Sequence, residues 1–306
     1  MGNSCKNRKL CDTIQEVFQK NRWEKREAEQ RNANGRVMCV SGKELNMKVI
    51  DFHTHPYDCL DEFLCMYPDV FVPSLQQAKA DLETAGIVHI CGSVLSKTKY
   101  DGSFAYLRHL NDKALEYAEK LDGFYTPGFH IHPDFVKESC EEIERMAEKG
   151  VRLIGELVPY MHGWHYDHPG LAEILDAAQK HHMVVSYHTM KEDWPGMEVM
   201  IADHPGLTFV AAHPGEKDQF FGHLEMMKKY PNAFLDLSGT GLFRYGILSY
   251  GVREAGAERF LFGTDYPICN PRMYVQAVLH EQLTPEQHEQ VLYGNALRIL
   301  PEIERK

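Results

Sequence analysis

One short stretch decides the fold and chemistry of this chain: Val49-Ile50-Asp51-Phe52-His53-Thr54-His55-Pro56. The apolar run that begins at Met47 predicts a β-strand, and Pro56 ends it because proline has no N–H to donate to a sheet. Residues i and i+2 of a strand point to the same face, so His53 and His55 present two imidazoles side by side. Such a pair is either the start of a metal site or two surface histidines at a strand end.

An apolar strand followed by a helix recurs along the chain. Strands are expected at 48–53, 87–94, 124–130, 151–157, 183–188, 207–212, 233–237 and 259–264. The helical patterns between them begin at Ser or Asp and end before Gly, as at 74–85 and 134–149. Eight such units predict an α/β fold, a (β/α)8 TIM barrel over residues 47–306. The rival, an open doubly wound sheet, needs a glycine-rich turn where this chain has His-Thr-His-Pro.

The two ends of the chain differ from this repeat. Residues 1–46 are expected to form an N-terminal helical extension, because 13–32 is rich in charged residues with spaced apolar positions. This helix is expected to pack against the barrel or a neighbouring subunit. The tail at 284–300 predicts one or two helices that close the barrel from outside.

Charge and composition narrow the class of partner. The formal net charge of −11 argues against nucleic acid as the main partner. No apolar run approaches the roughly 18 residues of a membrane span. Eight cysteines without C-x-x-C pairs, and no secretory segment, favour reduced thiols in a cytoplasmic protein. A small-molecule substrate is the expected partner, and a homo-oligomer stays open.

Barrel active sites lie at the C-terminal ends of the strands, so the side chains at those ends are the candidates. Five strand ends carry metal-ligand types: His53 and His55, then Glu156, His188, His213 and Asp265. One alone could cap a helix or be a hydrogen-bonded histidine, but their regular recurrence predicts a divalent metal site. Histidines with carboxylates favour Zn²⁺, with Mn²⁺ or Fe²⁺ as alternatives. Asp265, in contact with metal and water, could then carry a proton to a leaving group.

Five motifs together carry a resemblance to a known family. They are Asp51-Phe52-His53-Thr54-His55-Pro56, the lone His188, His213-Pro214-Gly215, Phe262-Gly263-Thr264-Asp265-Tyr266-Pro267 and the closing Gly294-Asn295-Ala296-Leu297-Arg298-Ile299-Leu300. Over about 47–300, the chain resembles the amidohydrolase superfamily. Within it, the chain resembles the amidohydrolase-related branch (amidohydrolase family 2), which includes aminocarboxymuconate-semialdehyde decarboxylase and metal-dependent lactonases.

The resemblance implies two alternative ligand sets. With one ion, His53, His55, His188 and Asp265 would be the ligands, and His213 would act as an acid, a base or an electrostatic group. With two ions, Glu156 would bridge them, His53, His55 and Asp265 would hold one, and His188 and His213 the other. If Glu156 does not bridge, it would orient a ligand histidine.

Three further features bear on the substrate. The loop at 159–168, with Tyr160, Trp164 and His165, is either a lid that contacts substrate or a loop packed by its own aromatic rings. A second His-x-His pair, His130 and His132, ends the third strand and competes with the first pair as a metal site. The resemblance favours pocket lining, or a role in orienting the ligands, over metal ligation for it. Arg244 is the best-placed cation for a substrate carboxylate or phosphate, or else a helix-surface arginine.

The expected function is that of a metal-dependent hydrolase of a small-molecule amide, lactone or other ester, acting through a metal-activated water. The alternatives are a non-oxidative decarboxylase of an unsaturated or aromatic acid, and a non-catalytic metal-binding scaffold. Glu156 favours hydrolysis because the decarboxylases of the branch use one metal.

Overall fold

The structure is a computed structural model that describes residues 37–38, 44–45, 47–67 and 73–305. Its first element is an antiparallel pair, β1 (Val37–Met38) with β2 (Glu44–Leu45), which the sequence patterns did not predict. The rest of the predicted N-terminal extension, including the helix at 13–32, lies outside the described residues.

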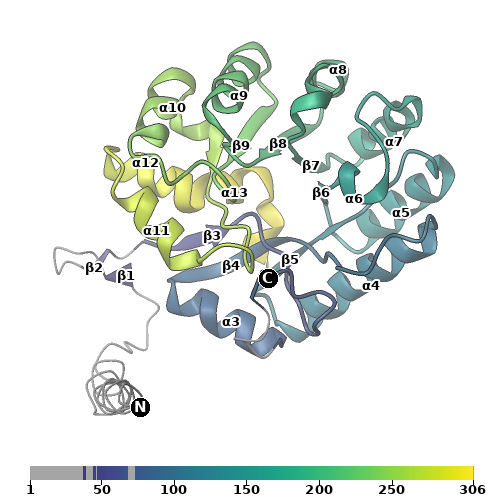
Figure 1. Ribbon diagram of the computed structural model, residues 1–306, viewed down its shortest axis with the longest axis horizontal. Helices are drawn as coiled ribbons and strands as arrows, with labels where there is room; N and C mark the ends of the chain where they lie inside the picture. Colours follow the sequence, from purple (N-terminus) through teal and green to yellow (C-terminus); the bar gives the residue numbers. More distant parts are fainter. Residues whose placement is uncertain (1–36, 39–43, 46, 68–72, 306) are drawn as a thin grey trace, which may run out of the picture. The chain divides into compact units, whose positions relative to one another are not determined.

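Eight parallel strands form one sheet that curls into a barrel (Figure 1). They are β3 (Val49–Asp51), β4 (Ile87–Ser93), β5 (Tyr125–Phe129), β6 (Leu153–Leu157), β7 (Val184–His188), β8 (Thr208–Ala212), β9 (Ala233–Asp236) and β10 (Phe260–Leu261). Their order in the sheet is their order in the chain. Just beyond its end strands the sheet closes, since Phe52 N–H donates to the Phe262 carbonyl and Asp265 N–H to the His53 carbonyl, both at 2.8 Å. The predicted (β/α)8 barrel is confirmed.

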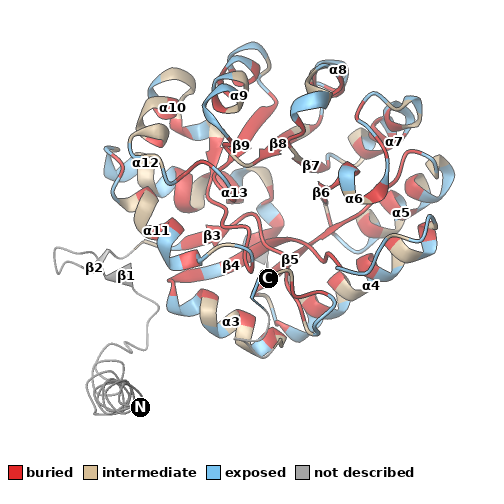
Figure 2. Ribbon diagram, viewed as in Figure 1, coloured by how far each residue is buried: buried red, intermediate tan, exposed pale blue. Residues whose placement is uncertain are grey.

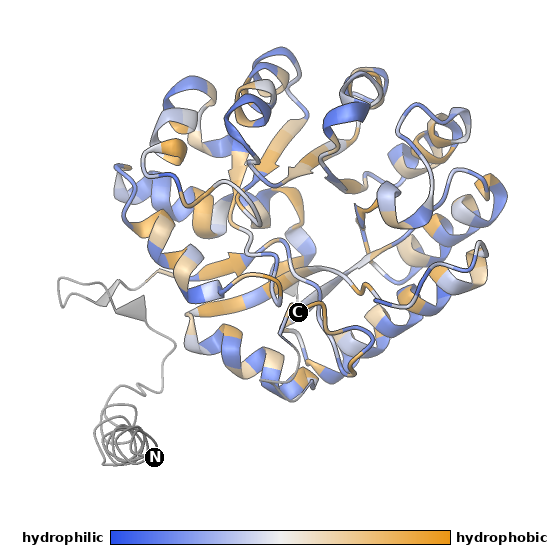
Figure 3. Ribbon diagram, viewed as in Figure 1, coloured by the Kyte–Doolittle hydropathy of each residue, from blue (hydrophilic) through white to orange (hydrophobic). Residues whose placement is uncertain are grey.

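Helices surround the barrel with their apolar faces towards the strands (Figure 3). The longer ones are α3 (Leu75–Thr84), α4 (Phe104–Lys120), α5 (Val136–Glu148), α7 (Pro169–Lys180), α8 (Trp194–Asp203), α9 (Lys217–Lys229), α10 (Ile247–Ala255) and α11 (Pro271–Leu279). Two predicted caps are present: Ser74 accepts the Gln77 N–H and starts α3, and Ser103 accepts the Tyr106 N–H and starts α4. The predicted start of the next helix at Asp134 is wrong, because α5 follows Phe135 and has no side-chain cap. No helix among the described residues is long and apolar enough to cross a membrane.

The strands are buried on both faces, which explains why they read as continuous apolar runs (Figure 2). The larger apolar cluster includes strand residues such as Phe209 and Leu235 together with residues of the surrounding helices. A smaller cluster takes residues from seven of the eight strands, including Ile50, Leu153 and Val184. Leu153 and Val184, the first residues of β6 and β7, belong to the smaller cluster, while Glu156 and His188 lie at the other ends of these strands.

The C-terminal tail is helical and packs against the barrel. It forms α12 (Pro285–Glu289), η4 (Gln290–Gly294), α13 (Asn295–Ile299) and η5 (Pro301–Arg305). Ala296, Leu300 and Ile303 are buried in the smaller cluster, against the strand residues listed above. The tail is therefore helical, as expected, and its apolar residues pack among those of the strands.

Candidate metal centre

A buried carboxylate locks the ends of β3 and β10 together. Asp51 accepts the backbone N–H groups of His53, at 3.2 Å, and Thr264, at 3.0 Å, and also the Thr264 hydroxyl at 2.5 Å. Burial raises the pKa of Asp51 to about 7, although these hydrogen bonds oppose the rise. The lock fixes His53 and Asp265 on adjacent strand ends.

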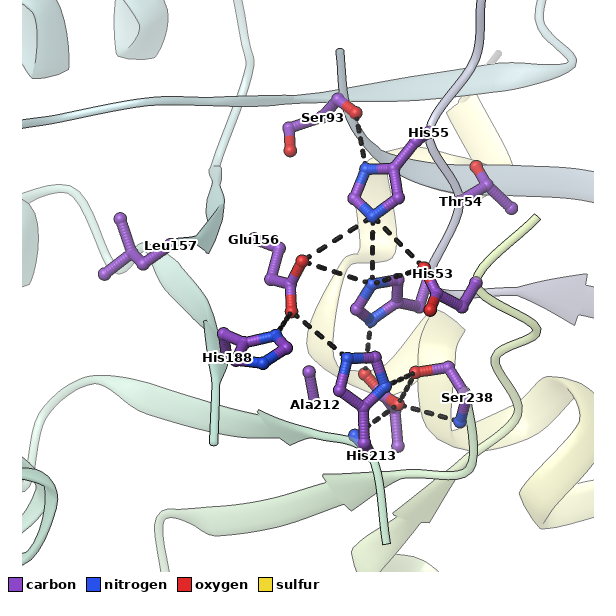
Figure 4. A network of polar contacts seen from close by, with 12 residues as sticks. His53, Thr54, His55, Ser93, Glu156, Leu157, His188, Ala212, His213 and Ser238 are labelled. Carbon is purple, nitrogen blue, oxygen red and sulfur yellow. Dashed lines mark hydrogen bonds and ion pairs between the residues drawn. The ribbon is translucent and has the colours of Figure 1, made fainter. Parts of the chain in front are cut away.

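His53 and His55 each have one ring nitrogen fixed by an acceptor. His53 Nδ1 lies 2.8 Å from Asp236 Oδ2, and His55 Nδ1 lies 3.0 Å from the Ser93 carbonyl. A carbonyl oxygen cannot donate a hydrogen bond, so Nδ1 of His55 carries the proton and Nε2 presents a lone pair. The two Nε2 atoms face each other at 3.3 Å (Figure 4).

Two carboxylates complete this group. Glu156 Oε2 lies 3.5 Å from His53 Nε2 and 3.6 Å from His55 Nε2. Asp265 Oδ1 lies 3.7 Å and 3.4 Å from the same two atoms. Four buried acceptor atoms thus converge where no neutral donor is aimed at them. Such a set needs a cation or added protons, and nitrogen with oxygen ligands suits a divalent transition metal.

The second oxygen of Glu156 faces a different pair of histidines. Oε1 lies 2.9 Å from His188 Nδ1 and 3.6 Å from His213 Nε2. His213 Nδ1 lies 3.0 Å from the Ser238 hydroxyl. Gly239 permits this approach, since a Cβ there would lie 2.3 Å from His213 Nδ1. One carboxylate therefore divides its oxygens between two histidine pairs.

The charges of the site are strongly coupled. Burial opposes the charged form of His53, yet Asp236 and Glu156 raise its pKa well above the usual value. Burial also opposes ionisation of Glu156, but His53 and His188 hold its pKa well below the usual range. The pKa of His213 is lowered by burial. The centre is thus an electronegative pocket that attracts positive charge.

The predicted ligand residues all come from the C-terminal ends of strands, and the fold brings them together. Two overlapping triads have their ligand atoms close enough for one ion each: His53, His55 and Asp265, and His53, Glu156 and His213. His188 lies outside both triads and contacts Glu156 instead.

Two residues of the centre escaped the sequence analysis. Asp236, at the end of β9, accepts from His53 and from the His213 backbone N–H. Ser238 donates to the same carboxylate and contacts His213. The available signal was an aspartate at the end of an apolar strand, within Phe234-Leu235-Asp236-Leu237. A carboxylate buried there is costly unless it has a partner.

The predicted substrate-binding residues take different positions. The Tyr160 ring, on the one-turn helix α6 (Pro159–His162), lies 4.8 Å from the His188 ring and is 58% exposed. Trp164 is buried against the rings of His132 and Tyr166. His165 is exposed and bonded to Asp193 at 2.8 Å. Of the three, only Tyr160 stands both exposed and beside the centre.

Arg244 lies before α10, not on it. Its guanidinium donates to the Gly215 carbonyl at 3.1 Å and pairs with the Glu216 carboxylate. Gly215 is two residues from His213, so Arg244 stands at the rim of the barrel mouth with its charge already matched.

Comparison with known proteins identifies the family and the fold of the chain. Residues 50–301 match the family described as amidohydrolase. The search of curated proteins found no match. Among solved structures, an uncharacterised TIM-barrel protein from Bordetella bronchiseptica is similar (TM-score 0.69, 20% identity, covering 85% of this chain and 100% of that one). The 2,6-dihydroxybenzoate decarboxylase from Rhizobium is also similar (TM-score 0.65, 14% identity, covering 83% of this chain and 99% of that one). A third similar structure is 5-carboxyvanillate decarboxylase from Novosphingobium aromaticivorans with bound manganese (TM-score 0.65, 14% identity, covering 84% of this chain and 97% of that one).

Proposed function

The chain belongs to the amidohydrolase family, and from this premise we propose that it is a metal-dependent hydrolase of a small-molecule amide, lactone or other ester. Membership supports a metal-dependent enzyme, and the choice of hydrolysis rests on one observation. The two oxygens of Glu156 face separate histidine pairs, His53 with His55 and His188 with His213.

A carboxylate divided in this way would be the shared ligand of two cations. His53, His55 and Asp265 would hold the first ion, and His188 and His213 the second, with Glu156 shared. His188 would exchange its contact with Glu156 for the ion. Zn²⁺ is the favoured metal because the set is rich in imidazole, with Mn²⁺ or Fe²⁺ as alternatives. The bound manganese of the similar 5-carboxyvanillate decarboxylase keeps Mn²⁺ in the test.

Divalent ions, when bound, lower the pKa of water to about 7 and polarise a substrate oxygen. The chain's own residues would do the rest. Asp265 would accept the proton from the attacking water and return it to the leaving group. His213, with its Nδ1 held by Ser238, keeps Nε2 aimed at the centre. Asp236 and the Ser93 carbonyl hold His53 and His55 in the orientation that binding requires.

The test combines metal content with turnover. Protein saturated with Zn²⁺ or Mn²⁺ is expected to hold two equivalents and to hydrolyse members of a panel of lactones, amides and esters. Asp265→Asn should lose turnover, while Asp193→Asn, which alters an aspartate in the neighbouring loop that pairs with His165, should keep it. One equivalent at saturation, with no hydrolysis across the panel, would contradict the proposal.

A second candidate function, non-oxidative decarboxylation of an unsaturated or aromatic acid, has its own support. The ligand atoms of His53, His55 and Asp265 lie close enough together for one ion, and this triad needs no bridging carboxylate. Two similar structures are decarboxylases of aromatic acids. In this reading, a protonated His213 or Asp265 would deliver the proton to the carbon that CO₂ leaves. Release of CO₂ from an aromatic acid by the one-metal protein would favour this alternative.

A further inference from the structure

Unpaired polar atoms gather on one side of the candidate metal centre. Among the described residues, six buried side-chain polar atoms have no hydrogen-bond partner. Four of them lie at or beyond the ends of β4, β5 and β6: Ser93 Oγ, Tyr100 OH, His130 Nδ1 and Trp164 Nε1. Buried polar groups in native proteins are nearly always paired, so a concentration of unpaired ones indicates a missing partner.

The rings of Tyr100, His130 and Trp164 are joined by those of His132 and His162 into a chain of neighbouring rings. His130 lies 5.5 Å from His162, His162 lies 5.2 Å from Tyr100, and Tyr100 lies 5.5 Å from His132, measured between ring centroids. The His132 ring lies 6.2 Å from that of Trp164. We call Ser93, Tyr100, His130, His132, His162 and Trp164 the aromatic wall. No Lys or Arg is among its members.

The aromatic wall adjoins the metal centre through Ser93. The Ser93 carbonyl accepts from His55, while the next carbonyl along the chain, of Val94, accepts from His130 Nε2 at 2.8 Å. Ser93 is paired in register with Gly128, two residues before His130. His55 of the metal centre and His130 of the aromatic wall are thus held by successive carbonyls at the end of β4.

The hydrogen bond to Val94 fixes what His130 offers. A carbonyl oxygen only accepts, so Nε2 of His130 carries the proton and Nδ1 presents a lone pair. Trp164 Nε1 can only donate, and the hydroxyls of Ser93 and Tyr100 can do either. A ligand group that satisfies the wall must donate to His130 and accept from Trp164 or a hydroxyl. An ionised carboxylate or phosphate has no hydrogen to give, so it leaves His130 unpaired.

We propose that Ser93, Tyr100, His130 and Trp164 form the specificity pocket of the enzyme. The pocket takes an uncharged group that carries both a donor and an acceptor, such as an amide N–H with its carbonyl or a ring hydroxyl. It rests on the proposed function only in placing the reacting end of the molecule at the metal centre. Tyr100 is the member of the aromatic wall that is only part-buried.

The pocket can be tested by binding, without turnover. The probes are benzamide, N,N-dimethylbenzamide, which lacks the N–H donors, and benzoate, titrated by calorimetry into the full-length Zn²⁺-loaded protein. Benzamide is expected to bind about 10-fold more tightly than its dimethyl analogue, and more tightly than benzoate, because a site built to accept a hydrogen bond rejects a ligand without the donor.

Two variants and a control locate the preference. His130→Gln places an amide donor where Nε2 was and has no acceptor at Nδ1, so the preference for benzamide should fall to about twofold or less. Trp164→Phe should weaken benzamide and the dimethyl analogue by similar factors and leave the preference in place. His109→Gln changes an exposed histidine of α4 and should keep both affinities. If His130→Gln does not fold, Tyr100→Phe serves, with an expected loss of benzamide affinity.

Three results would overturn the pocket: no benzamide binding by wild type, equal binding of the two amides, or a preference that survives in His130→Gln. Metal content and hydrolysis are measured separately, so a failed pocket leaves the metal centre standing. A protein that binds benzamide through His130 but hydrolyses nothing would contradict the proposed function alone.

Discussion

The chain contains two His-x-His pairs at strand ends, and the ring nitrogens of the two pairs have different partners. In the first, after β3, the Nδ1 atoms of His53 and His55 are held by acceptors, and both Nε2 atoms converge with two carboxylates. In the second, after β5, His130 and His132 direct Nε2 at the carbonyls of Val94 and His162. Nδ1 of His132 already accepts the Asp134 N–H.

The difference lies in what surrounds each pair. Glu156 and Asp265, from other strands, place oxygen atoms 3.4–3.7 Å from the first pair. Beside the second, the structure places rings, and the carboxylate within 4 Å, Asp134, is exposed and 3.9 Å away. A histidine becomes a metal-ligand candidate when one nitrogen is anchored and the other meets further ligands. The His-x-His spacing alone supplies neither condition.

The largest expected effect separates the two pairs by metal content. Replacing His53 and His55 together by Ala should remove the metal, since each triad loses a member. Replacing His130 and His132 together should leave the metal equivalents unchanged. Metal analysis of both proteins, with circular dichroism to confirm the fold, checks this. Loss of metal from the second double variant, and retention in the first, would reverse the assignment of the two pairs.

Glu156→Gln tests whether the first pair shares its site with a second ion. Gln keeps the shape but loses the charge that can bridge two cations. With two ions, the variant should drop from two equivalents to one and lose nearly all hydrolysis. With one ion, it should keep one equivalent and lose about 10–100-fold in affinity or activity, as for a residue that only orients a ligand. Equilibrium dialysis against Zn²⁺ distinguishes the two results.

Asp236→Asn tests the anchoring of His53. The amide can present its oxygen or its NH₂ group to His53 Nδ1, but it removes the charge that favours the anchored form. Metal affinity is expected to fall about 10–100-fold. Ser238→Ala, which removes a contact to His213 but leaves His53 anchored, should cost less. Competition with a zinc chelator measures both. An unchanged affinity in Asp236→Asn would mean that the anchor does not tune the metal.

His130 of the second pair and its neighbour His162 should make the stability of the protein depend on pH. Burial lowers the pKa of His130 to about 4 and that of His162 to about 3, from 6.5. Between pH 6.5 and these values, the unfolded chain binds more protons, so stability falls as pH falls. Each histidine should contribute a loss of roughly 2 kcal/mol between pH 7 and pH 5.

Urea unfolding of metal-free protein checks this sign. His162→Gln should show a shallower loss between pH 7 and pH 5 than wild type. His53 acts in the opposite direction, because Asp236 and Glu156 raise its pKa: its contribution is present below pH 6.5 and is lost as pH rises through the raised value. A loss as steep in His162→Gln as in wild type would mean that His162 is not held neutral.

The barrel and most of the centre could be predicted because both depend on local patterns. Apolar runs followed by capped helices predict the strands, and the ends of parallel strands share one edge of the sheet. His53, Glu156 and Asp265 therefore had to lie near each other. Asp236 also ends an apolar strand, but its role as the anchor of His53 could not be assigned, because His53 is 183 residues away and no short motif joins them.

The aromatic loop shows the other limit of the sequence. Trp164 and Tyr160 stand four residues apart in a loop that predicted either a lid or a self-packed segment. Trp164 is buried against the His132 ring, and Tyr160 is exposed beside His188. The loop is therefore partly packed by its own aromatic rings and partly open at the centre, as a lid would be. Which side chains turn inward depends on the ring partners from β5 and β7, and these are distant in sequence.

The smallest expected effect concerns Arg244, the cation predicted for an anionic substrate. Its guanidinium already donates to the Gly215 carbonyl and pairs with Glu216. A part-exposed pair of this kind contributes at most about 1 kcal/mol. Arg244→Met should therefore change KM for an ester that carries a carboxylate by less than about fivefold, the equivalent of 1 kcal/mol. Glu216→Gln releases the guanidinium and tests the reverse: if Arg244 can reach the substrate, this variant should lower KM, and adding Arg244→Met should abolish the gain. A KM increase well above fivefold in Arg244→Met alone would show that Arg244 leaves Glu216 for the substrate.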